Sequence, residues 1–225
     1  SHSTGTDNIA LGNVALKCNL TGGGNIVMGS EGLGCNITGS NNVALGCRAM
    51  FCNTSGRFNV AIGFKALNFN TTNDSSIAIG CVAGFCATCG PNVMIGGGAG
   101  YYLNGCNNTF VGHIAGHKST EATGNSFLGH FAGACNTTGD TNTSIGCKAG
   151  IGNTTGNSNI SIGHASGAQT CGATGSYNAT FGYRSGCSLT SGSCNIFLGI
   201  QAGNTISSGS RNIAVGHEVE LPSAT

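Results

Sequence analysis

The stretch Asn59-Val60-Ala61-Ile62-Gly63 decides the fold, because close variants of it recur along the whole chain. Each copy reads as a short strand closed by a glycine, and the 13 copies are spaced by 16, 17 or 19 residues. A period this short and this regular indicates a solenoid or a fibre. The closing glycines are Gly12, Gly29, Gly46, Gly63, Gly80, Gly96, Gly112, Gly129, Gly146, Gly163, Gly182, Gly199 and Gly216.

The composition limits the kinds of partner that we expect the chain to bind. Only 7% of the 225 residues are charged, and the net charge is +1. A chain so close to neutral lacks the clustered cations that phosphate contacts need, so we expect no nucleic-acid partner. No apolar run approaches the roughly 18 residues of a membrane-spanning helix, so we expect no membrane insertion. The unbroken array predicts one repeat domain over residues 1–217, followed by a terminal segment over residues 218–225.

The alternation within each copy predicts two faces of a strand. Val60 and Ile62 belong to columns of large apolar residues, and Ala61 lies between them on the opposite face. We predict that the two large columns point into the coil and that the uncharged middle column packs against a partner surface. Singly exposed small residues are the alternative. The predicted assembly face consists of Ala44, Ala61, Ala78, Phe110, Phe127 and Phe197.

The segment after each glycine predicts a tight return of the chain. Four residues after the glycine the chain carries Leu or Met in the first four copies, as in Leu67, and Gly in the next eight, so we expect the packing to change after the fourth copy. Asn136-Thr137-Thr138-Gly139 is typical of the turn that follows. These features predict an all-β, parallel β-solenoid of about 13 coils with a period near 17 residues.

An asparagine begins almost every strand, and stacked coils would align these residues in a ladder of amides. The ladder residues are Asn8, Asn25, Asn42, Asn59, Asn92, Asn108, Asn125, Asn142, Asn159, Asn178, Asn195 and Asn212.

The repeat Asn-[Ile/Val]-Ala-[Ile/Leu]-Gly, spaced by Asn-Thr-Thr-Gly, resembles two families. One is the left-handed parallel β-roll of trimeric autotransporter adhesin heads. The other is the Ala-Ile-Gly type repeat of phage tail fibres and of proteins that end in an endosialidase-type chaperone domain. The resemblance implies a left-handed β-roll, a homotrimer and a role in attachment.

Cysteine is the most unusual component, with 13 residues in the chain. Cysteines in one column of neighbouring coils would have Cα atoms about 4.8 Å apart, which a disulfide tolerates. We predict pairing among Cys18 with Cys35, Cys47 with Cys52, and Cys81 with Cys86, with free thiols as the alternative. Disulfides would indicate an extracellular protein.

Two further columns carry candidate sites. The position after the glycine is occupied in consecutive copies by His113, His130, Cys147 and His164, residue types that bind zinc, although a variable column without metal is the favoured interpretation. We therefore expect no cofactor. Six Asn-x-Ser/Thr sequons share one position of the turn, and turn chemistry alone is the alternative to glycosylation. Their asparagines are Asn19, Asn36, Asn53, Asn70, Asn136 and Asn153.

These observations predict a structural protein. We expect the shaft or head of an extracellular or virion fibre that attaches by multivalent assembly. Its partners would be copies of itself, as a homotrimer or an end-to-end filament, and a cell-surface receptor or glycan. Alternatives are a glycosylated matrix fibril and an ice-binding solenoid, although the outward threonine rank of the latter fails at Cys89, Gly105 and Glu121. Asp74 and Asp140 are too far apart for paired-carboxylate catalysis, so we expect no enzyme.

Overall fold

The structure is a computed structural model that describes residues 4–221. It forms two compact units, Ser1–Asn108 and Thr109–Thr225, and each is described by itself. Every strand is three residues long, and residues 4–221 contain no helix. The strands are β1 (Ile9–Leu11), β2 (Ile26–Met28), β3 (Val43–Leu45), β4 (Val60–Ile62), β5 (Ile77–Ile79) and β6 (Val93–Ile95) in the first unit, and β7 (Thr109–Val111), β8 (Ser126–Leu128), β9 (Thr143–Ile145), β10 (Ile160–Ile162), β11 (Ala179–Phe181), β12 (Ile196–Leu198) and β13 (Ile213–Val215) in the second.

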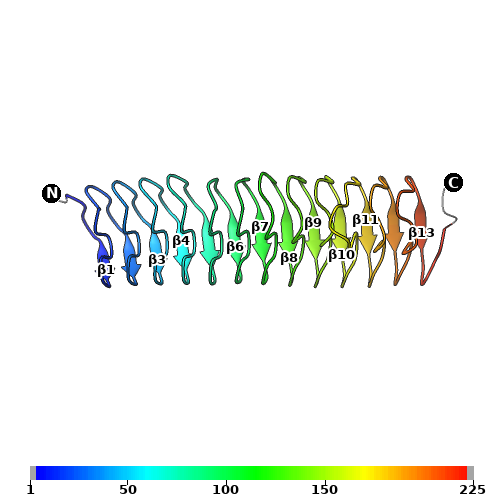
Figure 1. The fold of residues 1–225 in the computed structure, drawn as a ribbon, viewed down its shortest axis with the longest axis horizontal. Helices are drawn as coiled ribbons and strands as arrows, with labels where there is room; N and C mark the ends of the chain where they lie inside the picture. Colours follow the sequence, from blue (N-terminus) through cyan, green and yellow to red (C-terminus); the bar gives the residue numbers. More distant parts are fainter. Residues whose placement is uncertain (1–3, 222–225) are drawn as a thin grey trace. The chain divides into compact units, whose positions relative to one another are not determined.

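Within each unit the strands pair in parallel with the next strand of the chain, as Figure 1 shows. The register aligns equivalent positions of the repeat, so that Ala44 pairs with Ala61 and Ala61 with Ala78. One coil therefore corresponds to one repeat, and the predicted parallel β-solenoid with a period near 17 residues is confirmed.

The middle residue of each strand from β2 to β13 points into the coil, so the predicted direction of the strand faces is wrong. Ala61 has no exposed surface, whereas Val60 and Ile62 are half-buried. The predicted assembly face lies entirely inside the coils, because Ala44, Ala61, Ala78, Phe110, Phe127 and Phe197 are all at most 1% exposed. The interior of a short coil has room for one side chain from the strand, and the opposite wall supplies the rest.

The wall opposite the strand is formed by the residue four positions after the closing glycine. The size of that residue complements the size of the middle residue of the strand. Ala61 shares its coil with Leu67, and both are buried. In the second unit Phe127 takes the place of the small residue, and the opposite position is Gly133, where an added Cβ would collide with the phenyl ring. In these two coils the interior is filled from the opposite wall in one case and from the strand in the other.

The coil bends at positions where the backbone takes the left-handed conformation. In the fourth coil these residues are Phe58, Lys65 and Leu67, with φ between 49° and 58°. This region is unfavourable for side chains with a Cβ, so something must hold each corner. The amide of Lys65 donates to the carbonyl of Cys47 in the preceding coil at 3.0 Å, and that of Leu67 to Ala83 in the following coil at 3.0 Å. Stacking of the coils therefore stabilises their corners.

The predicted asparagine ladder at the start of the strands is confirmed within each unit. Asn42 Nδ2 donates to Asn25 Oδ1 at 3.1 Å, and the backbone amide of Asn42 donates to the same oxygen at 3.0 Å. Ser76 replaces asparagine in the fifth coil, and its backbone amide still donates to Asn59 Oδ1 at 2.9 Å. We call this column the strand-start ladder.

A second ladder, the turn ladder, consists of Asn19, Asn36, Asn53 and Asn70 in the first unit and Asn136 and Asn153 in the second. Asn36 Nδ2 donates to Asn19 Oδ1 at 2.8 Å and to the Gly39 carbonyl at 2.9 Å. The same carbonyl accepts from Asn25 Nδ2 at 2.9 Å, so one glycine oxygen joins the two ladders. A carbonyl has two lone pairs and can satisfy both donors.

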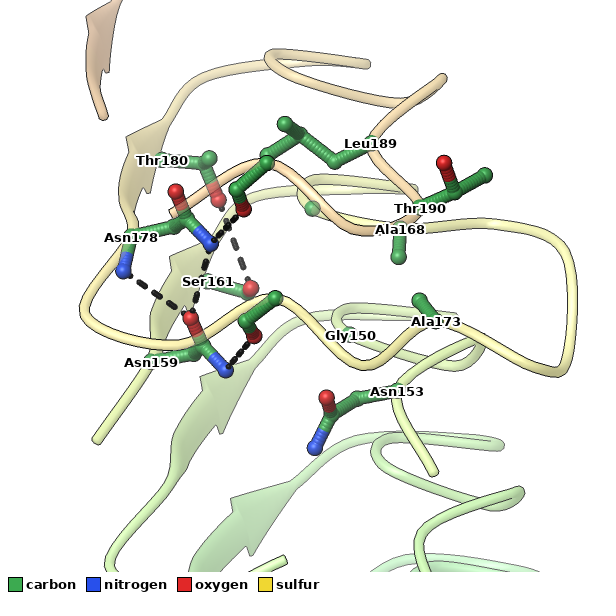
Figure 2. A pocket seen from close by; sticks show the side chains of 13 residues that line it. Gly150, Asn153, Asn159, Ser161, Ala168, Ala173, Asn178, Thr180, Leu189 and Thr190 are labelled. Carbon is green, nitrogen blue, oxygen red and sulfur yellow. Dashed lines mark hydrogen bonds between the residues drawn. The ribbon is translucent and has the colours of Figure 1, made fainter. Parts of the chain in front are cut away.

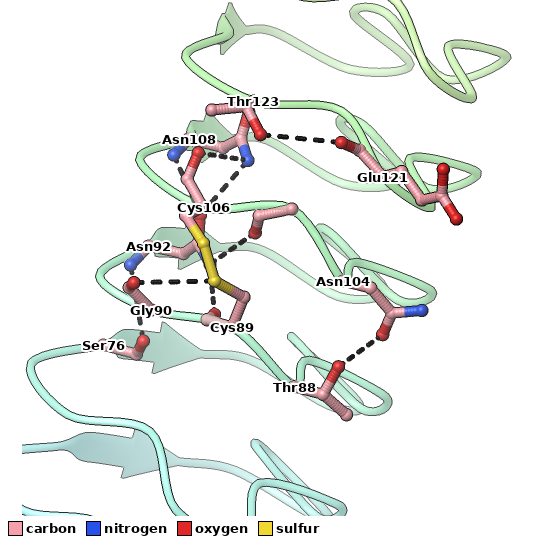
Figure 3. Close-up of a disulfide and its surroundings, with 11 residues drawn as sticks. Ser76, Thr88, Cys89, Gly90, Asn92, Asn104, Cys106, Asn108, Glu121 and Thr123 are labelled. Carbon is pink, nitrogen blue, oxygen red and sulfur yellow. Dashed lines mark hydrogen bonds between the residues drawn. A yellow bond between two sulfur atoms is a disulfide. The ribbon is translucent and has the colours of Figure 1, made fainter.

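A disulfide joins Cys89 and Cys106, which lie in the two repeats shortened to 16 residues. After Asn70 the turn position is taken by Ala87 and then Leu103, so the turn ladder of the first unit ends where this disulfide begins. Figure 3 shows the disulfide crossing between neighbouring coils beside the strand-start ladder.

The second disulfide joins Cys135 to Cys171, 36 residues apart, and belongs to the one repeat lengthened to 19 residues. Residues 168–173 of this repeat, which we call the strap, pack over Gly152 of the preceding coil, where a Cβ would collide with the Thr170 backbone. The Gly172 and Ala173 amides both donate to the Gly152 carbonyl. The disulfide thus joins the strap to Cys135, which lies two coils earlier in the chain.

The predicted terminal segment over residues 218–225 begins as part of a coil. The Glu218 amide donates to the Ile200 carbonyl at 2.8 Å, and the Val219 carbonyl accepts from Gly203 at 2.9 Å. Val219 and Leu221 pack against the buried cluster around Phe197. Residues 222–225 lie outside the described residues.

Candidate assembly face

The first and third residues of every strand point outward and form two columns on the surface of each unit, which we call the outward columns. In the first unit they are Ile9, Leu11, Ile26, Met28, Val43, Leu45, Val60, Ile62, Ile77, Ile79, Val93 and Ile95. In the second unit they are Thr109, Val111, Ser126, Leu128, Thr143, Ile145, Ile160, Ile162, Ala179, Phe181, Ile196, Leu198, Ile213 and Val215.

These columns make a surface that is apolar to an unusual degree. Leu128 is 50% exposed and Leu198 48%, and no position of the columns carries a charge. With strands about 4.8 Å apart and about 10 Å long, the six strands of the first unit present a strip of about 25 Å by 10 Å. Its footprint of about 250 Å² is close to that of the largest apolar patch on ordinary soluble monomers, and such patches are often functional.

The closing glycine ends each strand beside the backbone of the next coil. Gly63 has φ of 130°, in the region that favours glycine, and a Cβ on it would lie 2.5 Å from the Gly80 carbonyl oxygen. Glycine at this position therefore lets the backbone turn away from the sheet while the coils keep their spacing.

The column after the closing glycine carries the metal-ligand candidates beside the outward columns of the second unit. The rings of His113 and His130 stack with centroids 5.4 Å apart, and Cys147 Sγ lies 3.8 Å from His130 Nδ1. His164 stacks instead on Tyr183. Among the described residues no group of three or more His, Cys, Asp or Glu side chains converges in a way that could hold a metal ion. His130 therefore contacts both His113 and Cys147.

The predicted disulfides do not form, because the six candidate cysteines are free thiols. They are Cys18, Cys35, Cys47, Cys52, Cys81 and Cys86. Burial raises the pKa of the Cys35 thiol, and the neighbouring Cys18 raises it further. Burial also raises the pKa of Cys52, with a smaller contribution from Cys35. Cys18, Cys35 and Cys52 share one column and are thus close enough for their thiols to interact. Sharing a column does not by itself decide which cysteines form disulfides.

The sequon asparagines are the residues of the turn ladder, so the fold is incompatible with glycans on them. Asn36, Asn53, Asn70 and Asn136 have no exposed surface, and Asn153 is 9% exposed. Asn19 is half-buried, and its Nδ2 donates to the Gly22 carbonyl at 2.8 Å. The Nδ2 atom that would carry the sugar is a donor within the turn at each of the six positions. The predicted glycosylation candidates are therefore structural residues of the turn ladder.

The two carboxylates that were considered for catalysis bind backbone amides. Asp74 Oδ1 accepts from the Arg57 amide at 2.6 Å, and Asp140 Oδ1 accepts from the Thr123 amide at 2.7 Å. Each side chain therefore links its own turn to the turn of the coil before it.

The sequence contains signals for two features that we did not predict, the bonded cysteine pairs and the inward direction of the middle column. The bonded cysteines, Cys89, Cys106, Cys135 and Cys171, are associated with the repeats whose length departs from 17 residues. The inward direction of the middle column could have been found from the pairing of phenylalanine with glycine and of alanine with leucine in the two interior columns.

Comparisons with protein-family models, with curated proteins and with solved structures find no match for this chain. Within residues 4–221 the structure contains no helix that is both long enough and apolar enough to cross a membrane. The two disulfides indicate an oxidising, non-cytoplasmic environment.

Proposed function

We propose that this chain is a structural protein of an extracellular or virion fibre, which assembles with copies of itself through the outward columns and attaches to a cell-surface receptor or glycan. The observation that carries the proposal is the uncharged, apolar strip on the strands of each unit. The solenoid fold is consistent with a structural role, and the two disulfides fit a protein that works outside the cytoplasm.

A second copy of the chain fits this strip better than an unrelated partner. The outward columns repeat with the spacing of the coils, so a surface with the same spacing can place its side chains between them along the whole strip. The strip also has few polar groups, as in the interfaces of permanent oligomers. The resemblance to trimeric adhesin heads favours three copies.

The experiment measures the mass of the full chain in solution by sedimentation equilibrium. We expect the native protein to sediment as a trimer of the 22.2 kDa chain. Leu128→Glu and Ile196→Glu place a charge on the strip and should give monomers with an unchanged circular dichroism spectrum. Thr205→Glu, an exposed position outside the strands, is the matched control and should stay trimeric. A native monomer, or an oligomer that both strip variants leave intact, would overturn the proposal.

A further inference from the structure

The interior of the second unit is underfilled around β10 and β11. The middle residues of these strands, Ser161 and Thr180, are small and buried, and the opposite positions are Gly167 and Gly186. Neither wall supplies a large side chain, unlike the coil that contains Phe127. A cavity of about 20 Å³ remains between them, and Figure 2 shows the side chains that line it.

The turn ladder ends at one wall of this cavity. Asn153 Nδ2 donates to Asn136 Oδ1 and to the Gly156 carbonyl, both at 2.9 Å. The residue paired with Asn153 in the next coil is Ala173, which has no side-chain donor. Within the described residues Asn153 Oδ1 therefore accepts no hydrogen bond. In Figure 2 the oxygen of Asn153 points toward the part of the coil that carries Gly150 and Ala173, and the nitrogen points away from it.

A chain of hydroxyl groups ends at another wall. The Ser166 hydroxyl shares its hydrogen between the Thr180 carbonyl and Thr180 Oγ1, both at 2.9 Å. The Thr180 hydroxyl shares its own between the Ile160 carbonyl at 3.2 Å and Ser161 Oγ at 3.3 Å. Ser161 Oγ is an acceptor in this network, so the hydrogen of the Ser161 hydroxyl is left to donate. The cavity is thus lined by an acceptor without a donor, Asn153 Oδ1, and by a hydroxyl with an unused hydrogen.

We propose that this cavity is a binding site for one water molecule, which donates to Asn153 Oδ1, accepts from Ser161 Oγ, and so replaces the missing asparagine of the turn ladder at position 173. A cavity larger than about 10–15 Å³ can hold a water if two or more polar groups face it, and this cavity meets both conditions. No carboxylate lines it, so a multivalent cation would lack a counter-charge there.

The strap forms one side of the site. Ala168 and Ala173, on either side of Cys171, both line the cavity, and the disulfide to Cys135 holds the strap down on Gly152. The longer repeat thus removes an asparagine from the turn ladder and at the same time covers the resulting space. A polar molecule in this position lies against the strap.

The test compares two substitutions at one position in the full chain. Ala173→Asn supplies the missing amide in register with Asn153, and Ala173→Val fills similar space without a donor. We expect a crystal structure of the native protein to show one peak within hydrogen-bonding distance of Asn153 Oδ1 and Ser161 Oγ, and both variants to lose it. We also expect a higher Tm for Ala173→Asn than for Ala173→Val, because only asparagine restores the hydrogen bond.

Three results would overturn the proposal. The first is a native cavity that is dry and binds xenon, as an apolar cavity does. The second is an anomalous peak at the site in crystals soaked in rubidium chloride, which would identify a monovalent cation in place of water. The third is a Tm of Ala173→Val equal to or above that of Ala173→Asn, since the oxygen of Asn153 would then need no partner.

Discussion

The regular coils of the first unit and the coils of irregular length are held together by different means. Between Asn19 and Asn70 the repeats keep 17 residues, the turn ladder is continuous, and the cysteines are free. At Cys89–Cys106 and Cys135–Cys171 the repeat length changes, the turn ladder stops, and disulfides appear. At these two places a covalent bond joins coils whose repeat length has changed.

The largest effect should come from the strap. Replacing Cys135 and Cys171 together by serine removes the closure of a 36-residue loop, which is worth about 4 kcal/mol of unfolding free energy. The same change at Cys89 and Cys106 opens a 17-residue loop and should cost about 3 kcal/mol. Urea denaturation of the two double variants and the native chain measures both values. Native-like midpoints in both variants would show that the disulfides do not support the irregular coils.

A substitution in the turn ladder should cost almost as much. Asn36→Ala removes bonds to Asn19 Oδ1 and the Gly39 carbonyl and leaves Asn53 Nδ2 without its 2.8 Å acceptor, in a buried place. Unpaired buried groups cost about 1–3 kcal/mol each, so we expect a loss of about 3 kcal/mol. Asn13→Ala, at an exposed asparagine of the same region, is the control for the measurement by urea denaturation. Equal losses in the two variants would contradict a special role for the ladder.

Extending the ladder should stabilise the second unit by a smaller amount. Ser119 occupies the turn position before Asn136, and its buried Oγ has no partner among the described residues. Ser119→Asn can accept from Asn136 Nδ2 and should add about 1 kcal/mol to the unfolding free energy. Ser119→Ala removes the unpaired hydroxyl without adding an amide, so it separates the two contributions in a thermal melt. A lower Tm for Ser119→Asn than for Ser119→Ala would mean that the amide does not join the ladder.

The smallest effect concerns the free thiols. Burial raises the pKa of Cys35, Cys52 and Cys86, and only the thiolate reacts with iodoacetamide. These three should therefore be alkylated more slowly near neutral pH than the exposed Cys47 and Cys81, and their rates should keep rising with pH beyond the ordinary thiol range. Peptide mass spectrometry after timed labelling from pH 7 to 10 resolves the individual sites. Equal rates at all five would contradict this order.

Much of the fold could be predicted from the sequence, because the repeat fixes strand positions, pairing and the strand-start ladder together. Alternation along a strand defines two faces but does not say which one is inside, and the larger residues at Val60 and Ile62 suggested the wrong one. The pairing of Phe127 with Gly133 identifies the inner face of the strand, because it shows that these two positions share one interior. The column argument likewise placed Cys18 beside Cys35 but could not select bonded pairs, since strand spacing is equal for every coil.

Hydrogen exchange of the full chain, measured by mass spectrometry with and without a reductant, tests most directly whether the two classes of coil are held differently. We expect reduction to speed exchange at residues 86–108 and 150–173, around the two disulfides, and to leave residues 19–70 protected by their ladders. Equal loss of protection along the whole chain, or no change at the irregular coils, would contradict this division.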